Sequence, residues 1–140
     1  MPYREKTAWL SLAAISIAFT PYFAIVASIP HASALPNLRQ LGLFAAVVFA
    51  QALILALGHV YLAARTPLEA RTPPDERDRS ISRRSITLAY YVLICGMIVV
   101  GCVMPFTSGG WTIINAALLM IVLAEIVHYG TAVFNYRRQG

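Results

Sequence analysis

The chain has 140 residues, of which 59% are hydrophobic and 12% charged, whereas a soluble globular domain carries about 25% charged residues. This composition excludes a sizeable water-soluble domain, because four membrane spans of about 20 residues each would use more than half of the length. The net charge of +5 fits either nucleic acid or an anionic membrane surface, so the placement of the basic residues has to decide.

The basic residues gather in three segments of the chain. Ten of the eleven Lys and Arg residues lie in the amino-terminal tail, a central loop and the carboxyl-terminal tail. These ten are Arg4, Lys6, Arg65, Arg71, Arg77, Arg79, Arg83, Arg84, Arg137 and Arg138. With four spans the three segments share one side of the membrane, and the positive-inside rule places that side in the cytoplasm. We therefore expect both termini in the cytoplasm, the lipid bilayer as the surroundings and no nucleic acid as a partner.

The first half of the chain predicts one helical hairpin. Residues 8–29 form an apolar stretch long enough to cross a bilayer. Residues 30–40 contain two prolines and few strong helix formers, which indicates a short outer loop. The second span covers residues 41–64 and contains Gly42, Gly58 and several alanines. Small residues of this kind let membrane helices approach one another closely, so this span is expected to face other helices.

The central loop, residues 65–85, is the one long hydrophilic segment. Its prolines at positions 73 and 74 break the chain, and a helix should restart at Asp75, because acids in a first turn favour the positive helix end. Asp75 and Arg79 are spaced for an i,i+4 ion pair. We expect this helix to continue without a break into the third span, residues 86–104.

The second half of the chain predicts another hairpin. Residues 105–110 (PFTSGG) indicate a tight outer turn, and Trp111 marks the membrane interface before the fourth span, residues 112–134. The whole chain, residues 1–140, is therefore predicted to be a single all-α transmembrane domain, an integral membrane four-helix bundle of two helical hairpins with both termini cytoplasmic.

Two kinds of residue inside the spans are predicted to serve packing. Cys95 and Cys102 stand seven residues apart on one face of the third span, too far along the helix axis for an unstrained disulfide. We expect both thiols to be buried as small apolar groups. Asn115 and Gln51 are intramembrane amides, which most often bond one helix to another.

Glu125 is the strongest candidate for a functional side chain, because it is the one acid within a predicted span. An unpaired carboxylate there is costly, so it should face the bundle interior or a partner chain. His128 follows at i+3 on the same helix face, and His59 approaches the same inner side from the second span. Together with Gln51 these residues predict a polar intramembrane site near the cytoplasmic side.

The same residues are the candidates for a metal site. Glu-x-x-His is the spacing of di-iron ligands in helix bundles, but that architecture needs two such motifs, and this chain has one. His59 and His128 could instead ligate a haem axially. The alternative for each histidine is an interfacial or hydrogen-bonded packing role, and whether any cofactor binds stays open.

The acidic stretch at the start of the cytosolic helix is a candidate interaction surface. Asp75 and Asp78 fall on one helix face with Glu76 beside them, and Arg79 follows. These acids could bind a divalent cation or a basic partner. The alternative is a solvated juxtamembrane helix whose arginines contact anionic lipid.

The order of a two-span hairpin, a cytosolic loop carrying DERDRSI (Asp75 to Ile81), an aromatic-rich third span and a last span followed by YRRQG resembles a known group. This group comprises small uncharacterised prokaryotic four-helix membrane proteins with a DERD-x-x-I stretch. The resemblance covers most of the chain and implies the same architecture and a location in the bacterial cytoplasmic (inner) membrane. It implies no catalytic residue. The sequence also lacks the common soluble catalytic motifs, so an enzyme is the less favoured class.

Three functions remain open at this point. The first is a homo-oligomeric cation or proton transport or conductance protein that uses the Glu125 and His128 site. The second is an accessory or regulatory membrane subunit that docks a larger membrane partner through the helix of residues 75–84. The third is a membrane haem or metal-binding protein.

Overall fold

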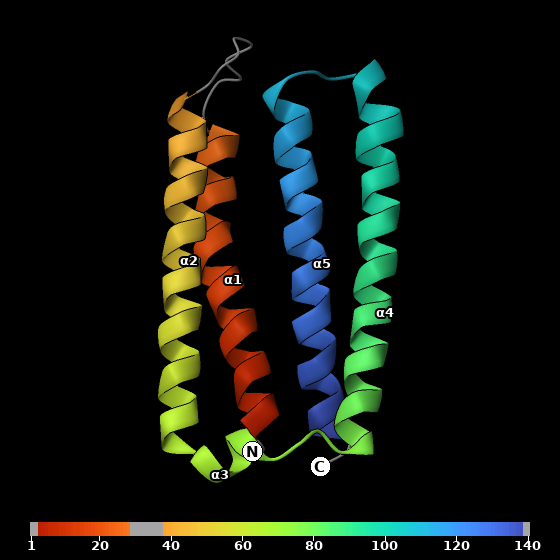
Figure 1. Ribbon diagram of the computed structural model, residues 1–140. Coiled ribbons are helices and arrows are strands. Elements are labelled where there is room, and N and C mark those ends of the chain that lie inside the picture. Colours follow the sequence, from red (N-terminus) through yellow and green to blue (C-terminus); the bar gives the residue numbers. More distant parts are fainter. Residues whose placement is uncertain (1–2, 29–37, 139–140) are drawn as a thin grey trace.

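The part of the protein that the computed structural model describes, residues 3–28 and 38–138, consists of helices joined by short turns and contains no strand (Figure 1). The elements are α1 (Tyr3–Ser28), α2 (Leu38–Arg65), α3 (Pro67–Arg71), α4 (Glu76–Ile98), the π-helix η1 (Val99–Val103), the 3-10 helix η2 (Met104–Phe106) and α5 (Trp111–Arg138). Four helical segments, 3–28, 38–65, 76–106 and 111–138, are long and apolar enough to cross a membrane. The prediction of an all-α protein with four membrane-length helices is confirmed. Most of the predicted outer loop, residues 30–40, lies outside the described residues.

The helix that leads into the third span begins where the sequence indicates. Asp75 has an extended backbone, with φ −74° and ψ 177°, and its side-chain Oδ1 accepts a hydrogen bond of 2.7 Å from the backbone N–H of Asp78. This N-cap satisfies one of the free backbone donors in the first turn. The predicted ion pair between Asp75 and Arg79 is wrong, because in the part of the chain that is described these groups do not come within 4.0 Å. The Asp75 carboxylate bonds to the helix end instead.

The outer end of α4 changes its winding before the chain turns. Residues Val99–Val103 form the π-helix η1, and Met104–Phe106 form the 3-10 helix η2. Pro105 has no N–H to donate to the carbonyl of Gly101 four residues earlier, and its ring presses on the preceding turn. The wider and then tighter turns accommodate this loss, and Gly110 reverses the chain with a φ of 54°.

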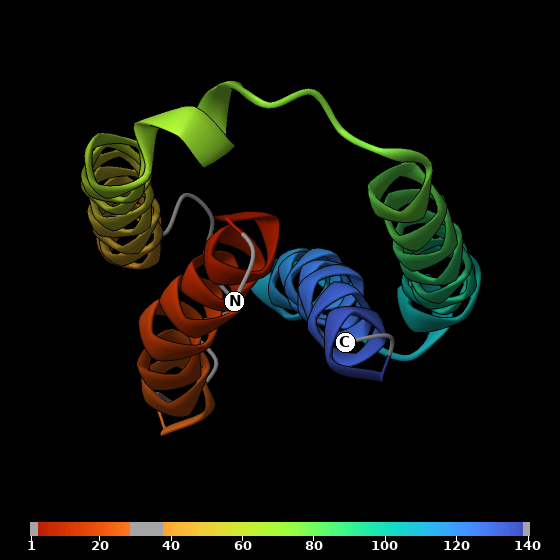
Figure 2. The ribbon, with the colours of Figure 1, turned by 90° about the horizontal axis from the view of Figure 1, so that it is seen from below.

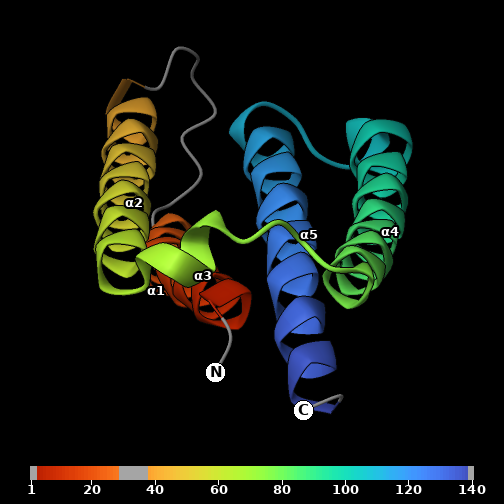
Figure 3. The same cartoon turned by 60° about the horizontal axis from the view of Figure 1, so that its bottom comes forward.

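The four long helices stand in an open arc in the order α2, α1, α5, α4 (Figure 2). Neighbours along this arc pack on each other, and α2 and α4 occupy its two ends. The segment from α3 to the start of α4 runs across one end of the molecule and connects α2 with α4 (Figure 3). The beginning of α1 and the end of α5 lie at this same end (Figure 1), which we call the linker end. The arc therefore has a concave face that the linker crosses.

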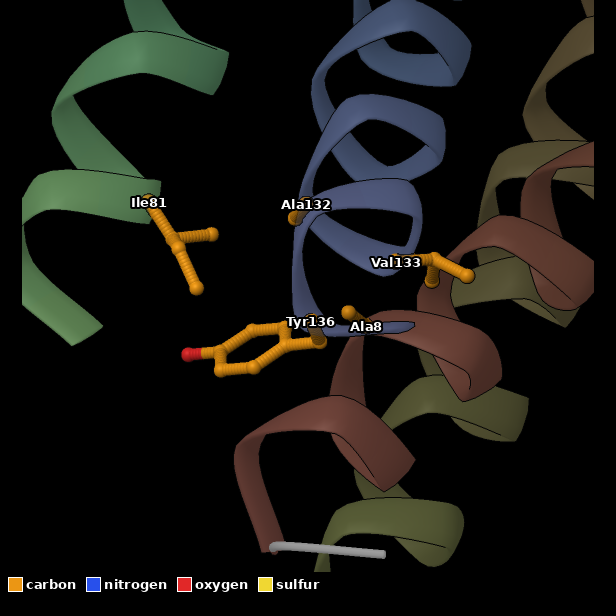
Figure 4. Close-up of a cluster of buried hydrophobic side chains, with 5 residues drawn as sticks. All are labelled: Ala8, Ile81, Ala132, Val133 and Tyr136. Carbon is orange, nitrogen blue, oxygen red and sulfur yellow. The ribbon is translucent and has the colours of Figure 1, made fainter. Parts of the chain in front are cut away.

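Two clusters of apolar side chains hold the arc together. The cluster at the linker end joins α1, α4 and α5 and consists of Ala8, Ile81, Ala132, Val133 and Tyr136 (Figure 4). The second lies farther along α1 and α5 and consists of Ile15, Phe19, Tyr22 and Val122, with partly buried side chains of α2 against it. Tyr22 is 1% exposed and its hydroxyl donates a 2.8 Å hydrogen bond to Oδ1 of Asn115. The predicted role of Asn115 in bonding two helices is confirmed.

The cysteine prediction is wrong, because Cys95 and Cys102 are both exposed. Helix α4 stands at the end of the arc, and among the long helices it packs chiefly on α5. Gly96 is the position that meets α5, so the adjacent Cys95, with Cys102 two turns further along, lies away from that contact. A helix at the edge of an arc buries one narrow stripe and leaves the rest of its apolar surface to lipid or to another chain.

Gly96 sets how closely α4 approaches α5. A Cβ atom at this position would collide with the side chain of Met120. We therefore expect Gly96→Val to destabilise the protein by about 1–3 kcal/mol through overpacking, measured as a lower thermal midpoint in detergent. Gly130→Val is the matched control, because a Cβ there meets nothing within 4 Å. Adding Met120→Ala to the Gly96 variant should recover most of the loss, and equal midpoints for the two glycine variants would contradict this packing.

Candidate functional site

The predicted site residues lie on the concave face of the arc, in two adjoining hollows. The first, which we call the basin, is a cavity of about 520 Å³ at the linker end, lined by side chains of α1, α2, α4 and α5 and by Pro74 of the linker. The second, which we call the groove, has about 260 Å³ and is lined by side chains of α1, α2 and α5. The groove is apolar except for Gln51 and Glu125.

The basin and the groove follow each other along three helices. On α2, Gln51 lines the groove while Leu55 and His59, four and eight residues later, line the basin. On α5, Glu125 lines the groove and His128 lines the basin. Residues three or four apart share one helix face. The concave face is therefore one continuous surface that runs from the basin to Glu125.

Glu125 and His128 form the closest pair of titratable groups on this surface. Oε2 of Glu125 lies 3.9 Å from Nδ1 of His128, and the two side chains are 47% and 27% exposed respectively. The prediction that Glu125 is shielded inside the bundle does not hold within a single chain, because helix α5 turns this side chain toward the open groove. Its other predicted surroundings, a partner chain, remain a prediction.

His59 is fixed by its own helix. Its Nδ1 lies 2.7 Å from the backbone carbonyl of Leu55, and since a carbonyl oxygen only accepts hydrogen bonds, Nδ1 is the nitrogen that carries the proton. This leaves Nε2 of His59 as the ring nitrogen available for proton exchange or ligation. Across residues 3–28 and 38–138 no group of three His, Cys, Asp or Glu side chains could hold a metal ion. Metal binding by His59, Glu125 and His128 stays a prediction.

The acidic stretch has a structural role that the sequence did not suggest. Asp78 accepts from Arg4 at 3.0 Å between Oδ2 and Nε, and from the Tyr136 hydroxyl at 2.8 Å on Oδ1. Both carboxylate oxygens are thus engaged within the chain, and Asp75 is occupied as the helix cap. Of the three acids proposed for docking, Glu76 alone is exposed with no partner among the described residues.

Arg4 and Tyr136 are the important residues that sequence reasoning missed. They come from opposite ends of the chain and meet at Asp78, so this junction ties the beginning of α1, the beginning of α4 and the end of α5 together. Arg77 adds a 3.3 Å hydrogen bond to the backbone carbonyl of Tyr136. Arg4 counts among the basic residues of the amino-terminal tail, and Tyr136 begins the YRRQG stretch; the spacing of neither residue reveals a contact with Asp78 across 58 residues or more.

Four apolar helices of membrane length, with polar side chains on a concave face and the arginine-rich segments at one end, define an integral membrane protein. The chain belongs to a family described as predicted membrane protein (DUF2178), whose model matches residues 4–139. Neither the curated proteins nor the solved structures contain a significant match. The family assignment supports the resemblance to membrane proteins of unknown function. That the DERD-x-x-I stretch is typical of the group, and that the protein is prokaryotic, remain predictions.

Proposed function

We propose that this protein is a homo-oligomeric proton transport or conductance protein, with Glu125 and His128 as its exchange site. The observation that supports this proposal is the continuous concave surface on which His59, His128, Glu125 and Gln51 follow one another from the basin into the membrane-spanning region. Carboxyl and imidazole groups take up and release protons, and intramembrane residues of this kind form proton relays in pumps and transporters.

A proton fits this surface better than a hydrated metal cation. The basin is lined by three arginines, Arg4, Arg79 and Arg83, and by one acidic side chain, Asp78. A metal cation passing through it would meet repulsion in an environment of reduced dielectric. A proton can instead be passed between neighbouring groups, and the 3.9 Å separation of Glu125 and His128 is a short step.

The exposure of Glu125 favours an oligomer. Its side chain is 47% exposed beside the apolar lining of the groove, where a carboxylate facing lipid would be strongly disfavoured. A second copy that covers the groove would close it and shield this group. The arginine-rich linker end would lie in the cytoplasm of a bacterial inner membrane, as the positive-inside rule predicts.

The two other functions have less support. Docking of a larger membrane partner through residues 75–84 would have to use Glu76 and exposed arginines, because Asp75 and Asp78 are already bound within the chain. Haem or metal binding has the two imidazoles of the basin in its favour and no larger ligand group among residues 3–28 and 38–138.

A flux measurement tests the proposal. Protein reconstituted into liposomes with an internal pH-sensitive dye is expected to dissipate an imposed pH gradient faster than empty liposomes, with valinomycin and K⁺ present to balance charge. Because the conducting unit is an oligomer, the rate should rise more steeply than linearly with the protein-to-lipid ratio at low ratios. A rate equal to that of empty liposomes for both gradient directions would overturn the proposal.

A further inference from the structure

The basin has an excess of positive charge that the proton pathway does not use. Arg4 is paired with Asp78, and both oxygens of that carboxylate are engaged. Arg79 and Arg83 also line the basin. In the described ranges, 3–28 and 38–138, neither of them makes an ion pair within 4.0 Å. Two arginines thus line one cavity without an ion-pair partner in these parts of the chain.

The spacing of these arginines suits a tetrahedral anion. Arg79 and Arg83 are four residues apart on α4, so their side chains leave one helix face about one turn apart. A guanidinium group presents paired N–H donors that match phosphate oxygens, and arginine pairs are well suited to bind phosphate groups for this reason. Ser82 lies on the same side of α4 and also lines the basin, which adds a hydroxyl donor.

The position and size of the basin fit a phosphate that is carried by a lipid. The volume of about 520 Å³ is within the range of small-ligand pockets. The basin lies at the linker end and adjoins the apolar groove. Its α4 side chains precede the predicted span that starts at residue 86, and its other side chains come partly from the ends of the other predicted spans. Basic pockets between membrane helices on the cytoplasmic side are suited to anionic headgroups.

We infer that the basin binds a phosphate group, with Arg79 and Arg83 as its cationic ligands and the headgroup of an anionic phospholipid as the favoured source. The single negative charge of a bound phosphodiester would offset part of the positive charge of the two arginines in the cavity that His59 and His128 also line. The inference goes beyond the proposed function, since a protein that conducts no protons could still bind this group.

The neighbouring Arg84 provides a matched control. It lies next to Arg83 in the sequence but lines a different hollow, of about 310 Å³, together with Arg138 and side chains on another face of α5. Arg83→Gln and Arg84→Gln therefore remove the same charge from adjacent positions and differ in which hollow loses it. All three arginines are exposed, so no loss of fold is expected from any of these changes.

The experiment measures binding to the purified protein in a non-ionic detergent by native mass spectrometry and by thermal shift. The probes are dioctanoyl phosphatidylglycerol, dioctanoyl phosphatidylcholine and glycerol 3-phosphate. We expect saturable binding of phosphatidylglycerol at one molecule per chain, weakened at least tenfold by Arg79→Gln with Arg83→Gln and less than twofold by Arg84→Gln. Arg83→Gln alone should weaken binding by an intermediate factor.

The arms of this experiment separate the two sources of phosphate. Binding of phosphatidylglycerol with weak binding of glycerol 3-phosphate identifies a lipid headgroup site, and equal binding of both identifies a site for soluble phosphate esters. Phosphatidylcholine should bind more weakly than phosphatidylglycerol, because its choline cation faces the arginines. The inference is overturned if no probe binds saturably, or if Arg84→Gln weakens binding as much as the Arg79 and Arg83 changes do. Proton flux in the same variants is measured separately, so failure of the two proposals can be told apart.

Discussion

Replacing Glu125 with glutamine is expected to abolish proton flux in reconstituted liposomes, reducing the rate to that of empty vesicles. Glutamine keeps the shape of the side chain and removes its ability to bind and release a proton. The groove has no other acidic side chain to take over this step. The change should leave the fold intact, because the side chain is 47% exposed and its contact with His128 is a long one of 3.9 Å.

The control for this prediction is Glu76→Gln, which removes an exposed carboxylate at the start of α4, away from the groove. Flux in the control should stay within twofold of the wild type. Glu125→Asp should conduct at a reduced rate, since the shorter side chain keeps the carboxyl group but moves it away from His128. A Glu125→Gln protein that conducts as fast as the wild type would eliminate this residue as the exchange site.

Replacing Asp78 with alanine is expected to cause the largest loss of stability of any single change in the acidic stretch, about 2 kcal/mol. The substitution removes the ion pair with Arg4 and the hydrogen bond from Tyr136, and it leaves two partly buried donors without their partner. This loss of stability is at the low end for a charged pair, because the side chains of Arg4 and Asp78 are 38% and 19% exposed and solvent screens their charges.

Thermal unfolding in detergent, followed by circular dichroism, measures this effect. Asp75→Ala should cost about 1 kcal/mol through loss of the helix cap, and Glu76→Gln should change little. The double variant of Asp78→Ala with Tyr136→Phe should lose less than the sum of the single losses, because the two residues share one hydrogen bond. Equal midpoints for the Asp75, Glu76 and Asp78 variants would contradict a junction centred on Asp78.

The local features of this fold were predictable because they depend on neighbours in the sequence. The restart of the helix follows from prolines and a capping acid within a few residues, and the four membrane-length helices follow from apolar runs. At Gly58 an added Cβ would collide with Leu10 of α1. The wider expectation that the second span faces other helices is wrong, because α2 stands at an end of the arc and none of its apolar window is buried. Each of these signals lies within one helix or its ends.

The features that were missed depend on how the helices are ordered in space. Hydropathy does not show which helices are neighbours. Cys95 and Cys102 are exposed because α4 stands at the end of the arc, which the sequence alone does not reveal. The junction of Arg4, Asp78 and Tyr136 needs three chain segments to meet. The i,i+4 rule failed at Asp75 and Arg79, because the capping bond competes for the same carboxylate.

The candidate site was predicted in its composition and only partly in its shape. The sequence indicated that His59 and His128 approach the same side, and the structure brings both to the basin. The structure places Glu125 and Gln51 farther from the linker end, in the groove. The contribution of Arg79 and Arg83 to the basin could not be foreseen, because it depends on which face of α4 turns toward the concave side of the arc.

The central seam of the arc joins the first long helix, α1, to the last one, α5. During synthesis α1 leaves the ribosome before α5 does. The stripe of α1 that receives α5 must therefore first contact lipid or membrane-insertion factors, and the two hairpins can join only after α5 has been made. A chain truncated within α5 would keep an intact first hairpin and lose the seam on which the whole assembly depends.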